Sequence, residues 1–286
     1  MTSHSTSRSA SPSQVPVGVD PTRPSIARVY GAFLGGKVVY EVDRQVMAEI
    51  TAAVPEAADL ARGNRGFRNR ACRFLTQTDI GQFLDCGSGL PTAENTHQIV
   101  QRHNDEARVV YVDNDPVVLA HGRALLEDDF RVRMVDADIF EPRRVVENET
   151  VRATIDFTVP VVLLLVGTMH YVCDDAAAPR IMREYIDALA PGSYVVFSHF
   201  IDPETPELTP IAKRVEDVLV NGPIGAGRFR TRAEVMAMVD GLEMVAPNAQ
   251  DPPGLSVCAE WWPDGPRIGG LSGAARCIVG GVGRKP

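Results

Sequence analysis

Apolar segments of strand length alternate with segments of helix length over most of this chain, and this alternation restricts the fold more than any other feature. Apolar runs occupy residues 82–86, 108–112, 131–135, 159–166 and 194–198, and helix-length segments occupy 93–102, 116–126 and 177–189. Several runs are almost wholly apolar, which is typical of parallel strands covered by helices on both faces. The pattern predicts a doubly wound α/β domain that binds ligands at the carboxyl ends of its central strands.

The sequence divides into three parts. Residues 1–24 are rich in Ser, Thr and Pro, so we expect a disordered tail. Residues 25–78 repeat apolar side chains at helical spacing, as in Val46, Ile50 and Val54, and predict a helical cap. Residues 79–286 form the α/β domain, in which we expect a late helix containing Val235 and Val239 and strands at 242–245 and 275–279.

Composition excludes several classes of protein. The formal net charge of −8 disfavours nucleic acid as a partner. The longest aliphatic run, residues 161–166, is far shorter than the roughly 20 residues of a membrane span. The first 13 residues contain no apolar core of a secretory signal, and the five scattered cysteines form no C-x-x-C pair. We therefore expect a cytoplasmic protein with reduced thiols, no metal site and no membrane partner.

A glycine loop follows the first predicted strand. It contains Asp85, Gly87, Ser88 and Gly89, and a helical pattern begins a few residues later. Two glycines one residue apart allow the backbone to approach a ligand at a helix N-terminus. The dinucleotide fingerprint requires a third glycine where Thr92 stands, so an NAD-dependent oxidoreductase is the weaker alternative.

Polar residues also follow the next two predicted strands. Asp113 and Asn114 follow the second strand, where a carboxylate can accept both hydrogen bonds of a ribose diol. Asp138 and Ile139 follow the third, where a carboxylate can accept from an adenine amino group while Ile139 packs on the purine. Together with the glycine loop these residues predict an adenosine site. The alternative is that each Asp only caps the helix that follows it.

The chain resembles a bacterial family of S-adenosylmethionine-dependent methyltransferases with the class I fold, whose substrate is undefined. The resemblance covers about residues 23–286 and rests on motifs at 27–30, 34–37, 64–67, 83–85, 89–92, 111–116 and 280–286. It implies a Rossmann-like seven-stranded sheet and S-adenosylmethionine as cofactor. Asp85, Gly87 and Gly89 would then lie at the methionine end, Asp113 at the ribose, and Asp138 with Ile139 at the adenine. The chain departs from the family at Cys86, at Ser88 and at residues 31–33.

The fourth predicted strand is followed by His170 and Tyr171, at the edge where the transferred methyl group should lie. His170 is suited to removing a proton from a hydroxyl, and Tyr171 to positioning the acceptor. The alternative is that His170 is a hydrogen-bonded structural imidazole. His199, at the end of the fifth strand, is the second candidate base. The segment lacks the Asn or Asp followed by Pro-Pro-Tyr of nucleic-acid amino methyltransferases, so we expect a small-molecule acceptor.

Four residues outside the strand ends are further candidates. Tyr30, Lys37 and Arg65 are predicted to form a lid over the cofactor or over an anionic group of the substrate, with a solvated helix face as the alternative. Trp261 is predicted to form a wall of the acceptor pocket, with an exposed interface as the alternative. The sequence thus predicts a methyltransferase for an unidentified small molecule; a protein that binds S-adenosyl ligands without turnover is the alternative from another class.

Overall fold

The computed structural model describes residues 18–92, 94–126, 129–266 and 269–286. Of the expected disordered tail, residues 1–17 lie outside the described residues. Residues 18–24 are described, and Val19 packs against the hydrophobic core. Within the described ranges, no helix combines the length and apolar character needed to cross a bilayer.

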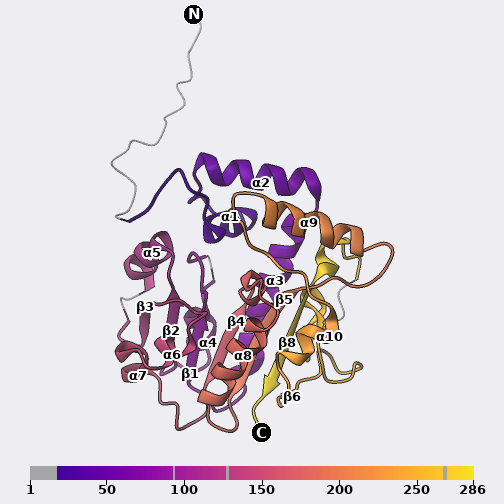
Figure 1. Ribbon diagram of the computed structural model, residues 1–286. Coiled ribbons are helices and arrows are strands. Elements are labelled where there is room, and N and C mark those ends of the chain that lie inside the picture. The colour runs from indigo at the N-terminus through magenta and orange to yellow at the C-terminus, as the bar shows by residue number, and fades with distance from the viewer. Residues whose placement is uncertain (1–17, 93, 127–128, 267–268) are drawn as a thin grey trace, which may run out of the picture.

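The protein is built on a single mixed sheet, shown in Figure 1. Its main path runs in the order β3-β2-β1-β4-β5-β8-β6, and β7 pairs with β8 beside that path. Strands β1 to β5 are parallel, whereas β8 is antiparallel to β5, β6 and β7. The strands are β1 (Gln82–Cys86), β2 (Arg108–Asp113), β3 (Val132–Asp136), β4 (Val162–Val166), β5 (Tyr194–Phe200), β6 (Glu243–Met244), β7 (Ser256–Val257) and β8 (Ile278–Arg284).

Helices connect the strands and cover both faces of the sheet. They are α1 (Ile26–Phe33), α2 (Glu41–Ala53), α3 (Ala57–Leu75), α4 (Thr96–Gln101), α5 (Pro116–Leu126), α6 (Pro142–Val146), α7 (Glu149–Thr154), α8 (Ala177–Ala188), α9 (Thr209–Asn221) and α10 (Arg232–Ala237). Short 3-10 turns are η2 (Met169–Tyr171), η3 (Cys258–Glu260) and η4 (Ala274–Cys277). The predicted doubly wound α/β fold is confirmed, with β7 added to the seven strands of the main path.

The alternation of side chains along the strands creates two hydrophobic cores. Phe83 of β1 lies in one core and Leu84 in the other, and Leu164 and Leu165 of β4 alternate in the same way. All four side chains are almost completely buried. The nearly continuous apolar runs in the sequence are therefore explained by burial on both faces of a parallel sheet.

Helices α1, α2 and α9 lie together above the carboxyl ends of the parallel strands (Figure 1). A buried ion pair from Arg28 Nε to Asp43 Oδ2, 2.6 Å long, joins α1 to α2. Helix α3 extends from this group onto the sheet, where Phe67, Ala71 and Leu75 share the core of Phe83. The predicted helical cap is therefore helical, and its longest helix also covers one face of the sheet.

The last strand begins later than the sequence pattern suggested. The segment 275–279 was expected to be a strand, but Ala274–Cys277 is a 3-10 turn and the strand runs over Ile278–Arg284. Its glycines are required by close packing: a Cβ on Gly280 would lie 2.7 Å from the Phe67 ring. Because a glycine-rich strand has no alternating apolar pattern, periodicity alone cannot locate it.

Candidate functional site

A cavity of about 470 Å³ lies between the carboxyl ends of the strands and the helices of the cap. This volume falls within the roughly 300–1,000 Å³ of small-molecule sites. The loops after β1, β2, β3 and β4 form one side, and most of the remaining lining comes from α1, α2, α3, α9 and the loop after α9. Arg23 and Pro24, which were assigned to the tail, also line it.

The glycine loop after β1 forms part of the cavity lining as expected. Gly87 has φ +75°, and a Cβ there would come within 2.3 Å of the Thr168 side chain. Gly89 has φ +65°, and a Cβ there would meet no heavy atom within 4 Å. Both positions require the left-handed backbone region that favours glycine. Gly87 thus allows close packing inside the protein, whereas Gly89 borders open space in the cavity.

Two carboxylates lie at the carboxyl ends of β1 and β2. Asp85 is buried and accepts a hydrogen bond from Thr96 Oγ1 at 2.6 Å; its burial raises its pKa, and the nearby Arg68 opposes that shift. Asp113 accepts from the backbone N–H of Gly89 at 2.9 Å. Burial raises the pKa of Asp113 to about 6, so this carboxyl group titrates much closer to neutrality than an exposed one.

The residues after β2 tie the cap to the sheet. Asn114 and Asp115 both line the cavity. The Asp115 carboxylate accepts a hydrogen bond from the hydroxyl of Ser25, the N-cap residue of α1. Ser25 was not predicted as a site residue. Its position before an apolar helical segment is a typical N-cap signal. Its contact with Asp115 could not be predicted from the local sequence, because Asp115 lies ninety residues later in the chain.

Of the two residues expected at the cavity after β3, only Ile139 lines it. Ile139 lines the cavity, together with its neighbour Phe140. Asp138 is outside the lining formed by the described residues, and its carboxylate accepts from the Phe140 N–H at 2.8 Å. The hydroxyl of Tyr185 donates to the Ile139 carbonyl at 2.8 Å and holds this turn in place. Asp138 therefore stabilises the turn, and apolar side chains face the cavity.

Three polar atoms of the cavity lining are buried without a hydrogen-bond partner in the described part of the chain. They are Ser88 Oγ, Thr168 Oγ1 and His170 Nδ1. Buried polar atoms in folded proteins are paired in the great majority of cases, so each such exception needs an explanation. Their common location in one cavity indicates that a bound ligand completes their hydrogen bonding.

His170 is held by aromatic neighbours. Its ring stacks on Phe200 with centroids 3.8 Å apart, and the His199 ring stands nearly perpendicular to it with centroids 5.7 Å apart. Burial lowers the pKa of His170 well below its usual value, with His199 and Arg230 adding to the effect. The imidazole is therefore neutral near pH 7, with a fixed orientation and an unpaired Nδ1 in the cavity lining.

Both ring nitrogens of His199 are hydrogen-bonded within the protein, which indicates a structural role. Arg230 Nη1 lies 3.1 Å from His199 Nε2, and since a guanidinium can only donate, Nε2 must be the acceptor. The other ring nitrogen, Nδ1, then donates to the Phe200 carbonyl at 2.6 Å. Burial lowers the pKa of His199 to about 4. Both nitrogens are occupied and the residue is outside the described cavity lining, so its role as second candidate base is not supported.

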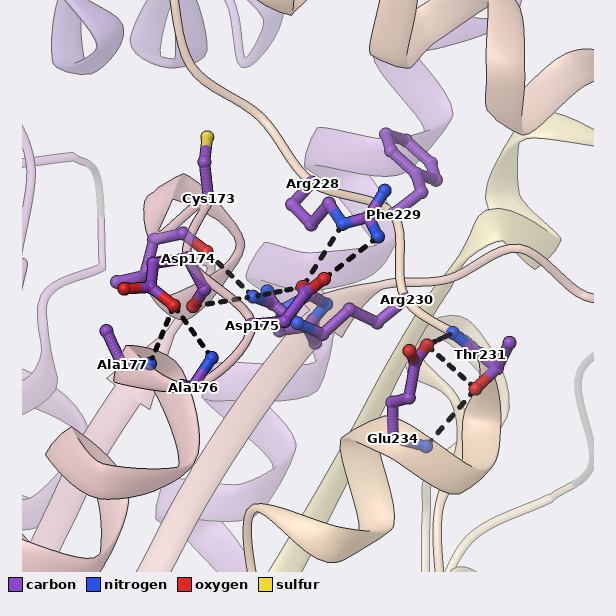
Figure 2. Close-up of polar contacts among 12 residues, drawn as sticks. Cys173, Asp174, Asp175, Ala176, Ala177, Arg228, Phe229, Arg230, Thr231 and Glu234 are labelled. Atoms are coloured by element: carbon purple, nitrogen blue, oxygen red, sulfur yellow. Dashed lines mark hydrogen bonds and ion pairs between the residues drawn. The ribbon is translucent and has the colours of Figure 1, made fainter.

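Arg230 also holds the segment that follows the turn of His170 and Tyr171, and Figure 2 shows its contacts with Asp174 and Asp175. Its Nη2 donates to the Val172 carbonyl at 2.9 Å and the Asp174 carbonyl at 3.3 Å, and lies 3.1 Å from the Asp175 carboxylate. Arg228 pairs with Asp175 at 3.2 Å, and its backbone N–H donates to the His170 carbonyl at 2.7 Å. We call the two arginines and Asp175 the arginine clamp.

Of the predicted lid residues, the structure brings two to the cavity. Tyr30 and Arg65 both line it, with the Arg65 guanidinium 5.6 Å from the Tyr30 ring centroid. Burial lowers the pKa of Arg65, and within the described ranges it forms no ion pair. Lys37 is exposed and lies outside the described lining, because α1 ends at Phe33 and the chain turns away at Gly35, which has φ +84°.

Trp261 is not exposed and does not line the cavity. It is completely buried against the edges of Phe67 and Phe74, at ring-centroid distances of 5.4 and 5.8 Å. The expectation of an acceptor wall or an exposed interface at this residue was wrong. Sequence gives no indication of this burial, because the contacts come from α3, almost two hundred residues earlier.

Comparison with known proteins agrees with this fold. A family described as S-adenosyl methyltransferase matches residues 12–286. A protein of Thermobifida fusca YX, provisionally named a methyltransferase, is 38% identical with a TM-score of 0.87 over 95% of this chain and 98% of its own. A DUF574 family protein of Streptomyces avermitilis MA-4680 is 33% identical with a TM-score of 0.83, over 92% of this chain and 98% of its own. A search of curated proteins finds no match.

The family match covers nearly the whole chain, including the glycine loop, the strand ends and the cap helices. The predicted dependence on S-adenosylmethionine is therefore confirmed, while the acceptor is not identified by any of these similarities. The chain belongs to the S-adenosyl methyltransferase family, and its cofactor is S-adenosylmethionine.

Proposed function

We propose that the protein transfers the methyl group of S-adenosylmethionine to a small molecule bound in the cavity beneath the cap. The observation that supports this most strongly is the set of unpaired buried polar atoms on Ser88, Thr168 and His170. When bound, the cofactor supplies an electrophilic methyl group on a sulfonium centre. The net charge of −8 and a cavity of about 470 Å³ fit a small acceptor better than a nucleic acid.

The lining residues match the parts of the cofactor. Asp113 accepts from the ribose hydroxyls at the end of β2, beside Asn114, and Ile139 and Phe140 pack beside the adenine. Gly87, Ser88 and Gly89 lie along the methionine part, where Ser88 Oγ gains a partner.

Two charged side chains suit the ends of the methionine part. Arg65 is a partly buried guanidinium with no carboxylate partner in the described residues, so it suits the cofactor carboxylate. Asp85 suits the cofactor ammonium group, and pairing with that cation would favour the ionised form of this buried carboxylate.

The acceptor side lies at the turn after β4. His170 presents a neutral imidazole to the cavity and takes a proton from the acceptor when one must be removed. Tyr171 lines the same region and positions the acceptor, and Tyr30 covers it from α1. Because methyl transfer requires an in-line approach, holding the acceptor in a closed site supplies much of the rate.

Calorimetric titration of the purified protein with S-adenosylmethionine, S-adenosylhomocysteine and NAD tests the cofactor site. We expect both adenosyl compounds to bind and NAD not to bind. Asp113→Asn should weaken S-adenosylhomocysteine about 10- to 100-fold, since a hydrogen bond to a charged group contributes roughly 1.5–3 kcal/mol. Binding of NAD alone, or unchanged affinity in Asp113→Asn, would contradict the site as proposed.

A further inference from the structure

The cap side of the cavity is almost wholly apolar. Every lining residue that α1, α2 and α9 contribute is apolar apart from Tyr30. The larger ones are Val29, Phe33, Ile50, Val215 and Leu219. Ile224, in the loop that follows α9, continues this apolar surface. We call the whole surface, Ile224 included, the apolar wall. The Arg28–Asp43 pair joins α1 to α2, and the contact of Ser25 with Asp115 joins α1 to the loop after β2, so this part of the wall is a built part of the fold.

Aromatic side chains border the same region. Tyr30 and Phe33 come from α1, Tyr171 from the turn after β4, and Phe200 from the end of β5. Phe200 stacks between His170 and Phe229, with centroid distances of 3.8 and 4.8 Å, so its ring is fixed. Aromatic rings favour other rings in offset or edge-to-face contact, which favours an acceptor that itself contains a ring.

The charged residues of the lining lie elsewhere. Arg65, Asp85 and Asp113 are assigned to the cofactor. Arg68 donates to the Glu94 carbonyl at 2.6 Å, Asp115 accepts from Ser25, and Arg23 is exposed before α1. None of the six belongs to α1, α2 or α9. An ionised acceptor placed against the apolar wall would lose hydration without gaining an opposite charge there, so the wall favours a neutral one.

His170 indicates the group that is methylated. A neutral amine has a free lone pair and needs no base before it attacks, whereas a hydroxyl must lose its proton. A neutral imidazole has one unprotonated nitrogen. In the tautomer that carries its proton on Nε2, the buried and unpaired Nδ1 of His170 is the acceptor that an O–H group requires.

We propose that the acceptor is a neutral aromatic compound carrying a hydroxyl group, which binds against the apolar wall with that hydroxyl at His170 Nδ1. This inference rests on the proposed function. The hydroxyl oxygen forms the new bond to the methyl carbon as the carbon–sulfur bond breaks, and the electron pair of that bond stays on sulfur. The proton passes to His170 Nδ1 and then to solvent. The products are an aryl methyl ether and S-adenosylhomocysteine.

The test uses phenol, 2-naphthol and 4-hydroxybiphenyl as neutral probes of increasing size, and 2-naphthoate and 2-naphthylamine as the anionic and amine counterparts. Each is titrated into the full protein saturated with S-adenosylhomocysteine. We expect at least one neutral hydroxyl probe to bind at least tenfold more tightly than 2-naphthoate. With S-adenosylmethionine, mass spectrometry should find the methyl ether of that probe and no methylation of the amine.

Variants separate the acceptor region from the cofactor site. Ile224→Asp places a charge in the cavity lining from the loop after α9, and should weaken the hydroxyl probe at least tenfold. Val220→Asp, at an exposed position of α9, is the matched control and should leave its affinity within twofold. Both should bind S-adenosylhomocysteine like the wild type. His170→Gln should bind the probe but methylate it about 100-fold or more slowly.

Several outcomes would overturn the inference while the proposed function stands. These are S-adenosylhomocysteine binding without binding of any hydroxyl probe, equal or tighter binding of 2-naphthoate, and binding of a hydroxyl probe that is never methylated. An equal loss of probe affinity in Val220→Asp and Ile224→Asp would exclude the apolar wall as the binding surface. Absence of S-adenosylmethionine binding to the wild type would instead overturn the proposed cofactor site.

Discussion

Asp113 is the residue whose charge most directly links cofactor binding to pH. Burial raises its pKa to about 6 in the free protein, and an ionised carboxylate can accept both ribose hydrogen bonds. Cofactor binding should therefore lower this pKa, and affinity should fall as pH drops below about 6. We expect the dissociation constant of S-adenosylhomocysteine, measured by calorimetry from pH 8 to pH 5, to rise by up to about tenfold per pH unit below pH 6.

The control for this pH dependence is Asp113→Asn, which removes the titrating group. Its affinity should be weaker than that of the wild type at pH 8 and should lose the decline below pH 6. The same decline in both proteins would assign the pH dependence to another group.

A substitution at Gly89 has two separable effects: strain in the backbone and a new side chain in the open part of the cavity. Gly89→Ala adds a methyl group at φ +65°, beside open space in the cavity. Gly35→Ala is the matched control, because Gly35 has φ +84° and equally open surroundings but lies outside the described lining. Both should lose about 1–2 kcal/mol of stability by urea unfolding. Only Gly89→Ala should also weaken S-adenosylhomocysteine binding; equal binding by both variants would remove Gly89 from the cofactor site.

Residue-level prediction from the sequence succeeded where the signal is local. The positions of Gly87, Gly89 and Asp113 at the cavity follow from their places at strand ends, which any parallel α/β sheet brings to one edge. It failed where distant contacts decide the environment. Trp261 is buried by α3, and both nitrogens of His199 are occupied through Arg230 and the Phe200 carbonyl. These partners are invisible in the local sequence.

The arginine clamp shows how one side chain can fix an element of the site. Arg230 is 2% exposed and serves two backbone carbonyls and His199. In Arg230→Leu the buried His199 Nε2 loses its donor, which costs about 1–3 kcal/mol, and the more accessible carbonyls of Val172 and Asp174 lose theirs as well. We expect a loss of at least about 2 kcal/mol in urea unfolding. Any measured methyl transfer should fall more than cofactor affinity, because the turn carrying His170 loosens.

Arg180→Leu is the control for the clamp. Arg180 is exposed on α8, and its pair with Glu184 is a surface i,i+4 contact worth at most about 0.5 kcal/mol. A similar stability loss in Arg180→Leu and Arg230→Leu would show that the clamp contributes no more than a surface pair.

Prediction of elements depended on the kind of pattern each carries. Strands β1 to β5 were located within a few residues, because apolar runs buried on both faces are distinctive. Strand β8 was misplaced because its three glycines carry no apolar pattern. The role of α9 at the cavity was missed, since an amphipathic helix shows which side is buried but not what it faces.

At the scale of the molecule, the cap and the sheet share one hydrophobic core. Ile50 of α2, Phe67 and Leu75 of α3, and Phe83 of β1 belong to the same buried cluster. Helix α3 therefore performs two tasks: it lines the cavity through Asn64, Arg65 and Arg68 and covers a face of the sheet. The division at residue 78, drawn from sequence, marks a change of periodicity; whether it marks a folding boundary remains a prediction to be tested.

Removing the cap tests this boundary. A chain of residues 79–286 lacks α3 and exposes the apolar face that Phe67, Ala71 and Leu75 cover in the full protein. Burial of apolar surface contributes about 25 cal/mol per Å² to stability. The free energy of unfolding of a typical domain is only roughly 5–15 kcal/mol, so exposing this face removes a large share of it. We expect no cooperative thermal transition by circular dichroism and no S-adenosylhomocysteine binding from this piece, and partial recovery of both when residues 18–78 are added as a separate peptide. A sharp transition of the shorter chain alone, equal to that of the full protein, would instead make the cap a separate folding unit placed over a sheet that is stable without it.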